Sequence, residues 1–182
     1  MRIIAGDLKG RNIKSVPGTN TRPTADKVKG AIFSVLGEKV MGAKILDLFS
    51  GTGNLAFEAI SRGAKWAKMI EKSRTARQVI EDNAENMKIS DRVEILGMDS
   101  FTYLERYQDE IFDLIFLDPP YKQGLVQKAL DALAQPCRLS DKGVIIAETS
   151  KDEEVSGCCP FELRKTGEYG DSKIWYFQRM DR

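Results

Sequence analysis

Four residues that can act on an amine follow directly after the apolar run 112–117: Asp118, Pro119, Pro120 and Tyr121. A proline disfavours the α conformation in the residue before it and has no backbone N–H, so this segment offers acceptors rather than donors. The Asp118 carboxylate and the Pro119 carbonyl can therefore accept both hydrogens of an NH2 group and make its nitrogen more nucleophilic. Tyr121 offers a face on which a planar base can stack, a contact worth roughly 1–3 kcal/mol. The segment predicts group transfer to the exocyclic amine of a nucleic-acid base, with a diproline turn that merely ends a strand as the alternative.

A glycine-rich turn occupies residues 47–56, between a predicted strand and a predicted helix. Gly51 and Gly53 would let a ligand approach the backbone closely. With Ala56 as the third small residue, the spacing also fits the dinucleotide fingerprint, so the glycines alone do not distinguish between nucleoside cofactors. Asp47 favours S-adenosylmethionine, because a carboxylate here would repel a pyrophosphate but attract an ammonium and a sulfonium. The alternative is a buried capping Asp beside a turn that is merely tight.

Two further acids follow predicted strands. Glu71 closes the second strand 24 residues after Asp47, where a doubly wound fold places an acid that accepts hydrogen bonds from ribose hydroxyls. Asp99 follows the third strand and could accept from an adenine amine, although capping a helix that starts near Phe101 is an equally physical role. In an open parallel sheet the carboxyl ends of the strands share one edge. We therefore expect these acids and Asp118 to meet in one crevice.

Short apolar runs alternate with amphipathic runs from residue 44 onward. We expect strands at 44–48, 67–70, 93–96, 112–117 and 143–147, and helices at 54–62, 74–87, 101–106 and 125–134. Strands that are apolar on both faces and joined by helices are typical of a parallel sheet covered on each side. The runs 161–166 and 174–178 flank a turn and predict a final antiparallel hairpin. The chain is thus predicted to be a single α/β, doubly wound, Rossmann-like domain over residues 1–182.

The first thirty residues are basic. They contain seven Lys or Arg residues against two Asp residues, a net charge of +5, whereas the whole chain of 182 residues carries +1. Runs at 2–5 and 12–16 predict a small β-hairpin, followed by a loop at 17–24 and a helix that Gly37 ends. We expect residues 1–24 to form an extension that contacts RNA phosphates. A solvated charged face is the alternative.

The composition excludes several kinds of chemistry. There is no histidine, so triads, Cys-His pairs and histidine-bound metals are excluded and acid–base chemistry must use carboxylates. Cys137, Cys158 and Cys159 include no C-x-x-C pair, which predicts neither a zinc site nor a disulfide framework. No apolar run approaches the roughly 20 residues of a bilayer span, and no leader is recognisable. We therefore expect a cytoplasmic protein that binds no metal and no membrane.

The chain resembles the bacterial RsmD-type 16S ribosomal RNA guanine-N2 methyltransferases. The resemblance covers nearly the whole chain and rests on segments 2–6, 10–11, 21–24, 47–53, 59–64, 71–72, 112–121 and 169–171. Ala5 departs from the family, which often has glycine at that position. DNA adenine and other amino methyltransferases share the Asp-Pro-Pro-Tyr segment. The N-terminal segments are therefore what narrows the resemblance to the RsmD-type family.

This resemblance implies a seven-stranded class I methyltransferase fold, S-adenosylmethionine as methyl donor, and transfer to N2 of a guanine. It assigns the catalytic loop to Asp118, Pro119, Pro120 and Tyr121. The expected cofactor residues are Asp47, Phe49, Gly51, Gly53, Glu71, Lys72, Asp99 and Ser100. The expected substrate residues are Arg2, Arg11, Arg22 and Thr24. The implied partner is ribosomal RNA in the small subunit or an assembly intermediate, bound by a monomer.

Four other functions remain open at this point. A DNA adenine-N6 methyltransferase would use the same catalytic loop. A cytosine-C5 methyltransferase would need a nucleophile such as Cys137, which lies well after that loop. A nicotinamide-dependent oxidoreductase would fit the glycine-rich turn, and a non-enzymatic RNA-binding module would fit the basic N-terminus.

Overall fold

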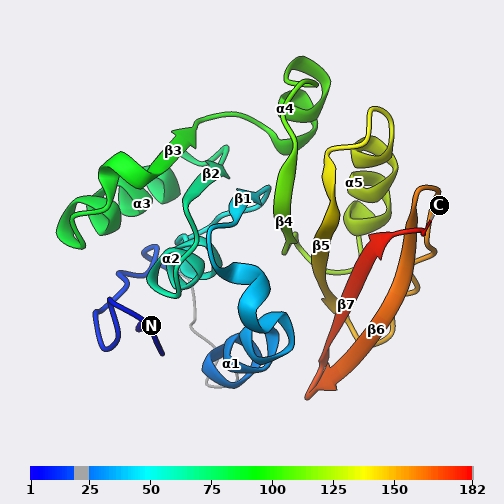
Figure 1. Ribbon diagram of the computed structural model, residues 1–182. Coiled ribbons are helices and arrows are strands. Elements are labelled where there is room, and N and C mark those ends of the chain that lie inside the picture. Colours follow the sequence, from blue (N-terminus) through cyan, green and yellow to red (C-terminus); the bar gives the residue numbers. More distant parts are fainter. Residues whose placement is uncertain (19–24, 182) are drawn as a thin grey trace.

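A mixed sheet of seven strands forms the centre of the computed structural model, which describes residues 1–18 and 25–181 (Figure 1). The strand order is β3-β2-β1-β4-β5-β7-β6. The strands are β1 Lys44–Asp47, β2 Trp66–Ile70, β3 Val93–Leu96, β4 Phe112–Leu117, β5 Leu139–Ser150, β6 Phe161–Tyr169 and β7 Ser172–Arg179. Strands β1 to β5 pair in parallel, whereas β7 pairs antiparallel with both β5 and β6. The predicted fold class, including the antiparallel last hairpin, is confirmed.

Helices cover both faces of the sheet (Figure 1). They are α1 Ala25–Leu36, α2 Asn54–Ser61, α3 Arg74–Asn86, α4 Ser100–Arg106 and α5 Leu125–Ala134. Successive strand residues point to opposite faces. Accordingly, Ile45 joins a cluster with α1, α2 and α3, and its neighbour Leu46 joins a second cluster with α4 and α5. Both faces are buried at the centre of the sheet, which explains why most residues of β1 and β4 are apolar. No helix within residues 1–18 and 25–181 is long and apolar enough to cross a membrane.

The N-terminal hairpin is less regular than the sequence predicts. It is joined by a single antiparallel bridge between Arg2 and Asn12 instead of two strands. The reason is that the segment docks on α2: the Glu58 carboxylate accepts the backbone N–H groups of Ile4 and Ala5 at 2.9 and 3.1 Å. Those donors are therefore unavailable for a longer ladder.

Candidate functional site

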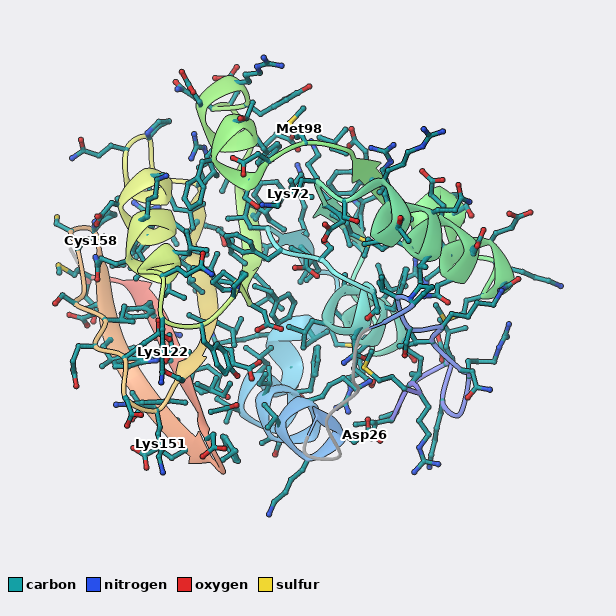
Figure 2. The ribbon with its side chains drawn as sticks, turned by 180° about the vertical axis from the view of Figure 1, so that it is seen from behind. Asp26, Lys72, Met98, Lys122, Lys151 and Cys158 are labelled. Atoms are coloured by element: carbon teal, nitrogen blue, oxygen red, sulfur yellow. The ribbon has the colours of Figure 1, made fainter. Side chains whose placement is uncertain are left out.

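A cleft of about 890 Å³ lies at the carboxyl ends of the central strands, between β1 and β4, where the strand order reverses. Ligands bind at such a switch point in open α/β sheets. The predicted site residues that line it are Asp47, Phe49, Gly51, Glu71, Lys72, Asp99, Ser100, Asp118, Pro119, Pro120 and Tyr121. Figure 2 labels Lys72, on the loop after β2, and Lys122, which follows Tyr121. The expected meeting of four strand-end acids in one crevice is thus observed.

Asp47 is the buried acid of the cleft, with only 2 % of its surface exposed. Its Oδ1 atom has no hydrogen-bond partner within the described residues. Burial raises the pKa of Asp47 to about 7, a backbone hydrogen bond from Phe49 opposes that rise, and the charge of Glu71 adds to it. An unpartnered buried acceptor is costly, and a cationic donor would relieve that cost. The side chain therefore fits the ammonium group of S-adenosylmethionine.

The two glycines of the glycine-rich turn lie in different surroundings: the backbone of Gly51 is open, whereas that of Gly53 is closely packed. Gly51 has a φ of 56°, and a Cβ added there would meet no atom within 4 Å, so its backbone faces open space. Gly53 has a φ of 85°, but a Cβ there would lie 2.4 Å from the Phe57 ring and 2.7 Å from Met69. Gly53 does not line the cleft. Gly53 immediately precedes the first residue of α2, and a glycine is required at this position because a side chain would collide with Phe57 and Met69.

Glu71 and Asp99 both bind backbone groups. Glu71 Oε2 accepts the Gly51 N–H at 2.8 Å and Oε1 accepts the Ser73 N–H at 2.9 Å. Since each carboxylate oxygen has two lone pairs, both can also accept a ribose hydroxyl. Asp99 Oδ2 caps α4 by accepting the N–H groups of Phe101 and its successor at 2.9 and 3.2 Å. The capping role considered for Asp99 is therefore present, at a position that also lines the cleft.

The catalytic loop begins where β4 ends. Asp118 is exposed and Pro119 is buried, and both line the cleft. The Tyr121 hydroxyl donates to Glu148 Oε1 at 2.7 Å and lies 2.8 Å from Ser172 Oγ. Because a phenol has one hydrogen, Ser172 is the donor in the second bond. Burial raises the pKa of Tyr121 to about 12, so the ring is neutral and held at its hydroxyl end.

Sequence reasoning missed Glu148 and Ser172, which line the cleft from β5 and β7. They lie 27 and 51 residues after Tyr121, and only the sheet brings them to it. The predicted strand 143–147 stops one residue before Glu148. In the structure β5 continues to Ser150, because Glu148 pairs with Ile174 of β7.

A buried ion pair at the other side of the cleft was also missed. Lys29 and Glu58 have side-chain exposures of 1 % and 0 %, and their Nζ and Oε1 atoms lie 3.0 Å apart. Lys29 also donates to Asn54 Oδ1 at 2.8 Å and to the Arg2 carbonyl at 2.7 Å. Lys29 and Asn54 line the cleft. The pair therefore ties α1, α2 and the N-terminal segment together beside the site.

Two of the predicted substrate residues, Arg2 and Arg11, lie outside the cleft. Arg2 is exposed and its Nε lies 4.0 Å from Asp26 Oδ2. Arg11 donates to the Asn86 carbonyl at the end of α3 at 2.5 Å. Neither lines the cleft. Arg22 and Thr24 lie outside the described residues.

Comparison with known proteins gives matches over almost the full length. Residues 1–178 match the family described as Conserved hypothetical protein 95. The chain is 34% identical over 157 residues to Ribosomal RNA small subunit methyltransferase D of Haemophilus influenzae, with 85% of this chain and 81% of that protein covered. The protein of the same name from Escherichia coli is 30% identical over 186 residues, with 94% and 93% covered. The solved structure of Escherichia coli yhhF has a TM-score of 0.88 at 25% identity, with 100% of this chain and 99% of that chain covered.

Proposed function

The chain belongs to the family described as Conserved hypothetical protein 95, the RsmD family, and from this premise we propose that it methylates N2 of a guanine in 16S ribosomal RNA. It has the class I methyltransferase fold, and S-adenosylmethionine is the methyl donor of this class. The single observation that carries the proposal is the shared cleft. It is lined both by the buried carboxylate of Asp47, whose Oδ1 atom has no hydrogen-bond partner within the described residues, and by the Asp-Pro-Pro-Tyr loop.

The chain's own residues would activate the amine. The Asp118 carboxylate and the Pro119 carbonyl accept its two hydrogens, and the Tyr121 ring stacks on a base turned out of its helix. When bound, S-adenosylmethionine supplies an electrophilic methyl group. Transfer would break the donor's sulfur–carbon bond and form a nitrogen–carbon bond, while Asp118 and Pro119 would hold the amine for attack. The methylated nitrogen then loses one proton to Asp118 or to water.

Asp47 and the turn that follows it would hold the cofactor. Asp47 binds its ammonium group, Glu71 its ribose hydroxyls, and Asp99 its adenine amine through the carboxylate that also caps α4. The open backbone at Gly51 allows close approach. Phe49, Lys72 and Ser100 line the same part of the cleft. Gly53 would act indirectly, by allowing the turn to pack.

The substrate assignment extends the names of the relatives to this chain. Both relatives are named for the small-subunit ribosomal RNA. Within one domain over residues 1–182, the N-terminal extension would contact RNA phosphates through basic side chains, which are exposed at Arg2, Lys9, Arg11 and Lys14. We propose that the protein acts as a monomer in the cytoplasm, on the small subunit or an assembly intermediate.

A methyl-transfer assay tests this proposal. The protein is incubated with labelled S-adenosylmethionine and, separately, with naked 16S ribosomal RNA, small subunits, assembly intermediates and DNA. Each product is then digested to nucleosides. Label in N2-methylguanosine from one of the ribosomal samples supports the proposal. Label in N6-methyladenine of DNA, or no transfer to any sample, overturns it.

A further inference from the structure

Glu148 is a second carboxylate on the substrate side of the cleft. It lies on β5, where its pairing with Ile174 of the neighbouring antiparallel strand fixes the backbone. The side chain is half-buried, lines the cleft, and accepts the Tyr121 hydroxyl at 2.7 Å. Glu148 is therefore a hydrogen-bond acceptor held at the hydroxyl end of the Tyr121 ring. In the proposed function, the target base stacks on this ring.

The Glu148 carboxylate can accept further hydrogen bonds besides the one from Tyr121. An ionised carboxylate has about four lone-pair sites, and the Tyr121 hydroxyl occupies one of them. The proposed function already uses Asp118 and Pro119 for the two hydrogens of the amine. Glu148 thus supplies acceptor capacity beyond what a bare NH2 group needs.

The three bases that carry an exocyclic amine differ at the neighbouring ring nitrogen. Guanine has an N–H donor at N1, next to its amine. Adenine and cytosine have a lone pair at the corresponding ring nitrogen. A carboxylate at this point would attract guanine and repel the other two bases, and a site whose buried polar groups are left unpaired rejects a ligand strongly.

We propose that Glu148 selects guanine by accepting its N1–H hydrogen while Asp118 and Pro119 hold the adjacent amine. This inference rests on the proposed function and names the residue that gives it base specificity. Because Glu148 also holds Tyr121, its contact with the base must be separated from its effect on the ring. The chain offers two variants that do so.

The test measures kcat/KM on RNA that carries either guanine or 2-aminopurine at the target position. 2-Aminopurine keeps the 2-amine but has a lone pair at N1. Glu148→Gln can still accept the Tyr121 hydroxyl, and its amide can also donate to that lone pair. We expect this variant to lose about 10- to 100-fold on guanine, as loss of a charged hydrogen bond does, and to lose much less on 2-aminopurine. The ratio of guanine to 2-aminopurine rates therefore falls.

The control is Tyr121→Phe, which removes the hydrogen bond to Glu148 but leaves the carboxylate in place. We expect it to lower both rates together and to keep their ratio. Equal losses on both substrates in Glu148→Gln would overturn the inference and leave Glu148 with only a positioning role for Tyr121.

A second measurement needs no variant. The wild-type protein should fail on RNA with 1-methylguanine at the target position, since the N1 hydrogen is absent. Methylation of that RNA at a rate near that of guanine would overturn the inference while leaving the proposed function intact. If the wild-type protein methylates no guanine in any RNA, the proposed function itself fails, and the inference fails with it.

Discussion

Glu71, at the end of β2, accepts a hydrogen bond from the backbone N–H of Gly51 at 2.8 Å, which couples the predicted ribose acceptor to the glycine-rich turn. The bond crosses from one strand end to the next on the cofactor side of the cleft. Loss of the Glu71 carboxylate would thus remove the proposed ribose contact and loosen the turn together.

We therefore expect Glu71→Ala to weaken S-adenosylhomocysteine binding by about 10- to 100-fold, the loss of one or two charged hydrogen bonds. Isothermal titration calorimetry measures this effect. The matched control is Lys65→Ala, at an exposed position away from the cleft, which should bind as the wild type does. Unchanged affinity in Glu71→Ala would show that the acid serves the turn alone.

The raised pKa of Asp47 predicts opposite pH trends for stability and for cofactor affinity. Burial raises this pKa from 3.8 to about 7 in the folded protein. The stabilising contribution of Asp47 is then fully present below pH 3.8 and is lost as the pH rises through about 7. The free energy of unfolding, measured relative to Asp47→Asn in urea, should decrease across that range.

Cofactor affinity should follow the ionised form of the same group. If the ammonium group binds ionised Asp47, S-adenosylhomocysteine should bind about tenfold more tightly at about pH 8 than at about pH 6. The Asn variant should bind weakly and with a flatter pH profile. Equal pH profiles in the two proteins would rule out Asp47 as the residue that titrates.

Substitutions at Asp118 should separate catalysis from cofactor binding. Asp118→Ala removes one of the two proposed amine acceptors, and we expect kcat to fall by about 10²–10³, as when one aligned transition-state hydrogen bond is lost. Asp118→Asn keeps an acceptor oxygen and should retain more activity than the Ala variant. Both should bind S-adenosylhomocysteine normally, because Asp118 follows β4, whereas the expected cofactor residues lie at or just after the ends of β1, β2 and β3. Loss of that binding would contradict the assigned role.

The sequence predicts those parts of the site that depend on local order along the chain. Asp47, Glu71 and Asp118 each end an apolar strand, so strand periodicity alone placed them at one sheet edge. The sequence does not predict Glu148 as a site residue, because β5 extends past its apolar run only through pairing with β7. The N-terminal strands were predicted from β-propensity, but Glu58 takes two of their backbone donors. Such tertiary pairings leave no periodic signal in the sequence.

The buried pair of Lys29 and Glu58 should stabilise the protein by holding the N-terminal segment on α2. Within residues 1–18 and 25–181, Lys29→Ala leaves the buried Glu58 carboxylate with the partly exposed Arg62 as its one remaining cation. Breaking a buried pair by removing one partner costs about 3 kcal/mol or more. We expect that loss in the free energy of unfolding in urea, together with faster amide exchange at Ile4 and Ala5, whose N–H groups Glu58 accepts. Lys27→Ala, at an exposed position on the same helix, should change neither measurement. A loss of stability without faster exchange at Ile4 and Ala5 would show that the pair serves the helices and not the N-terminal segment.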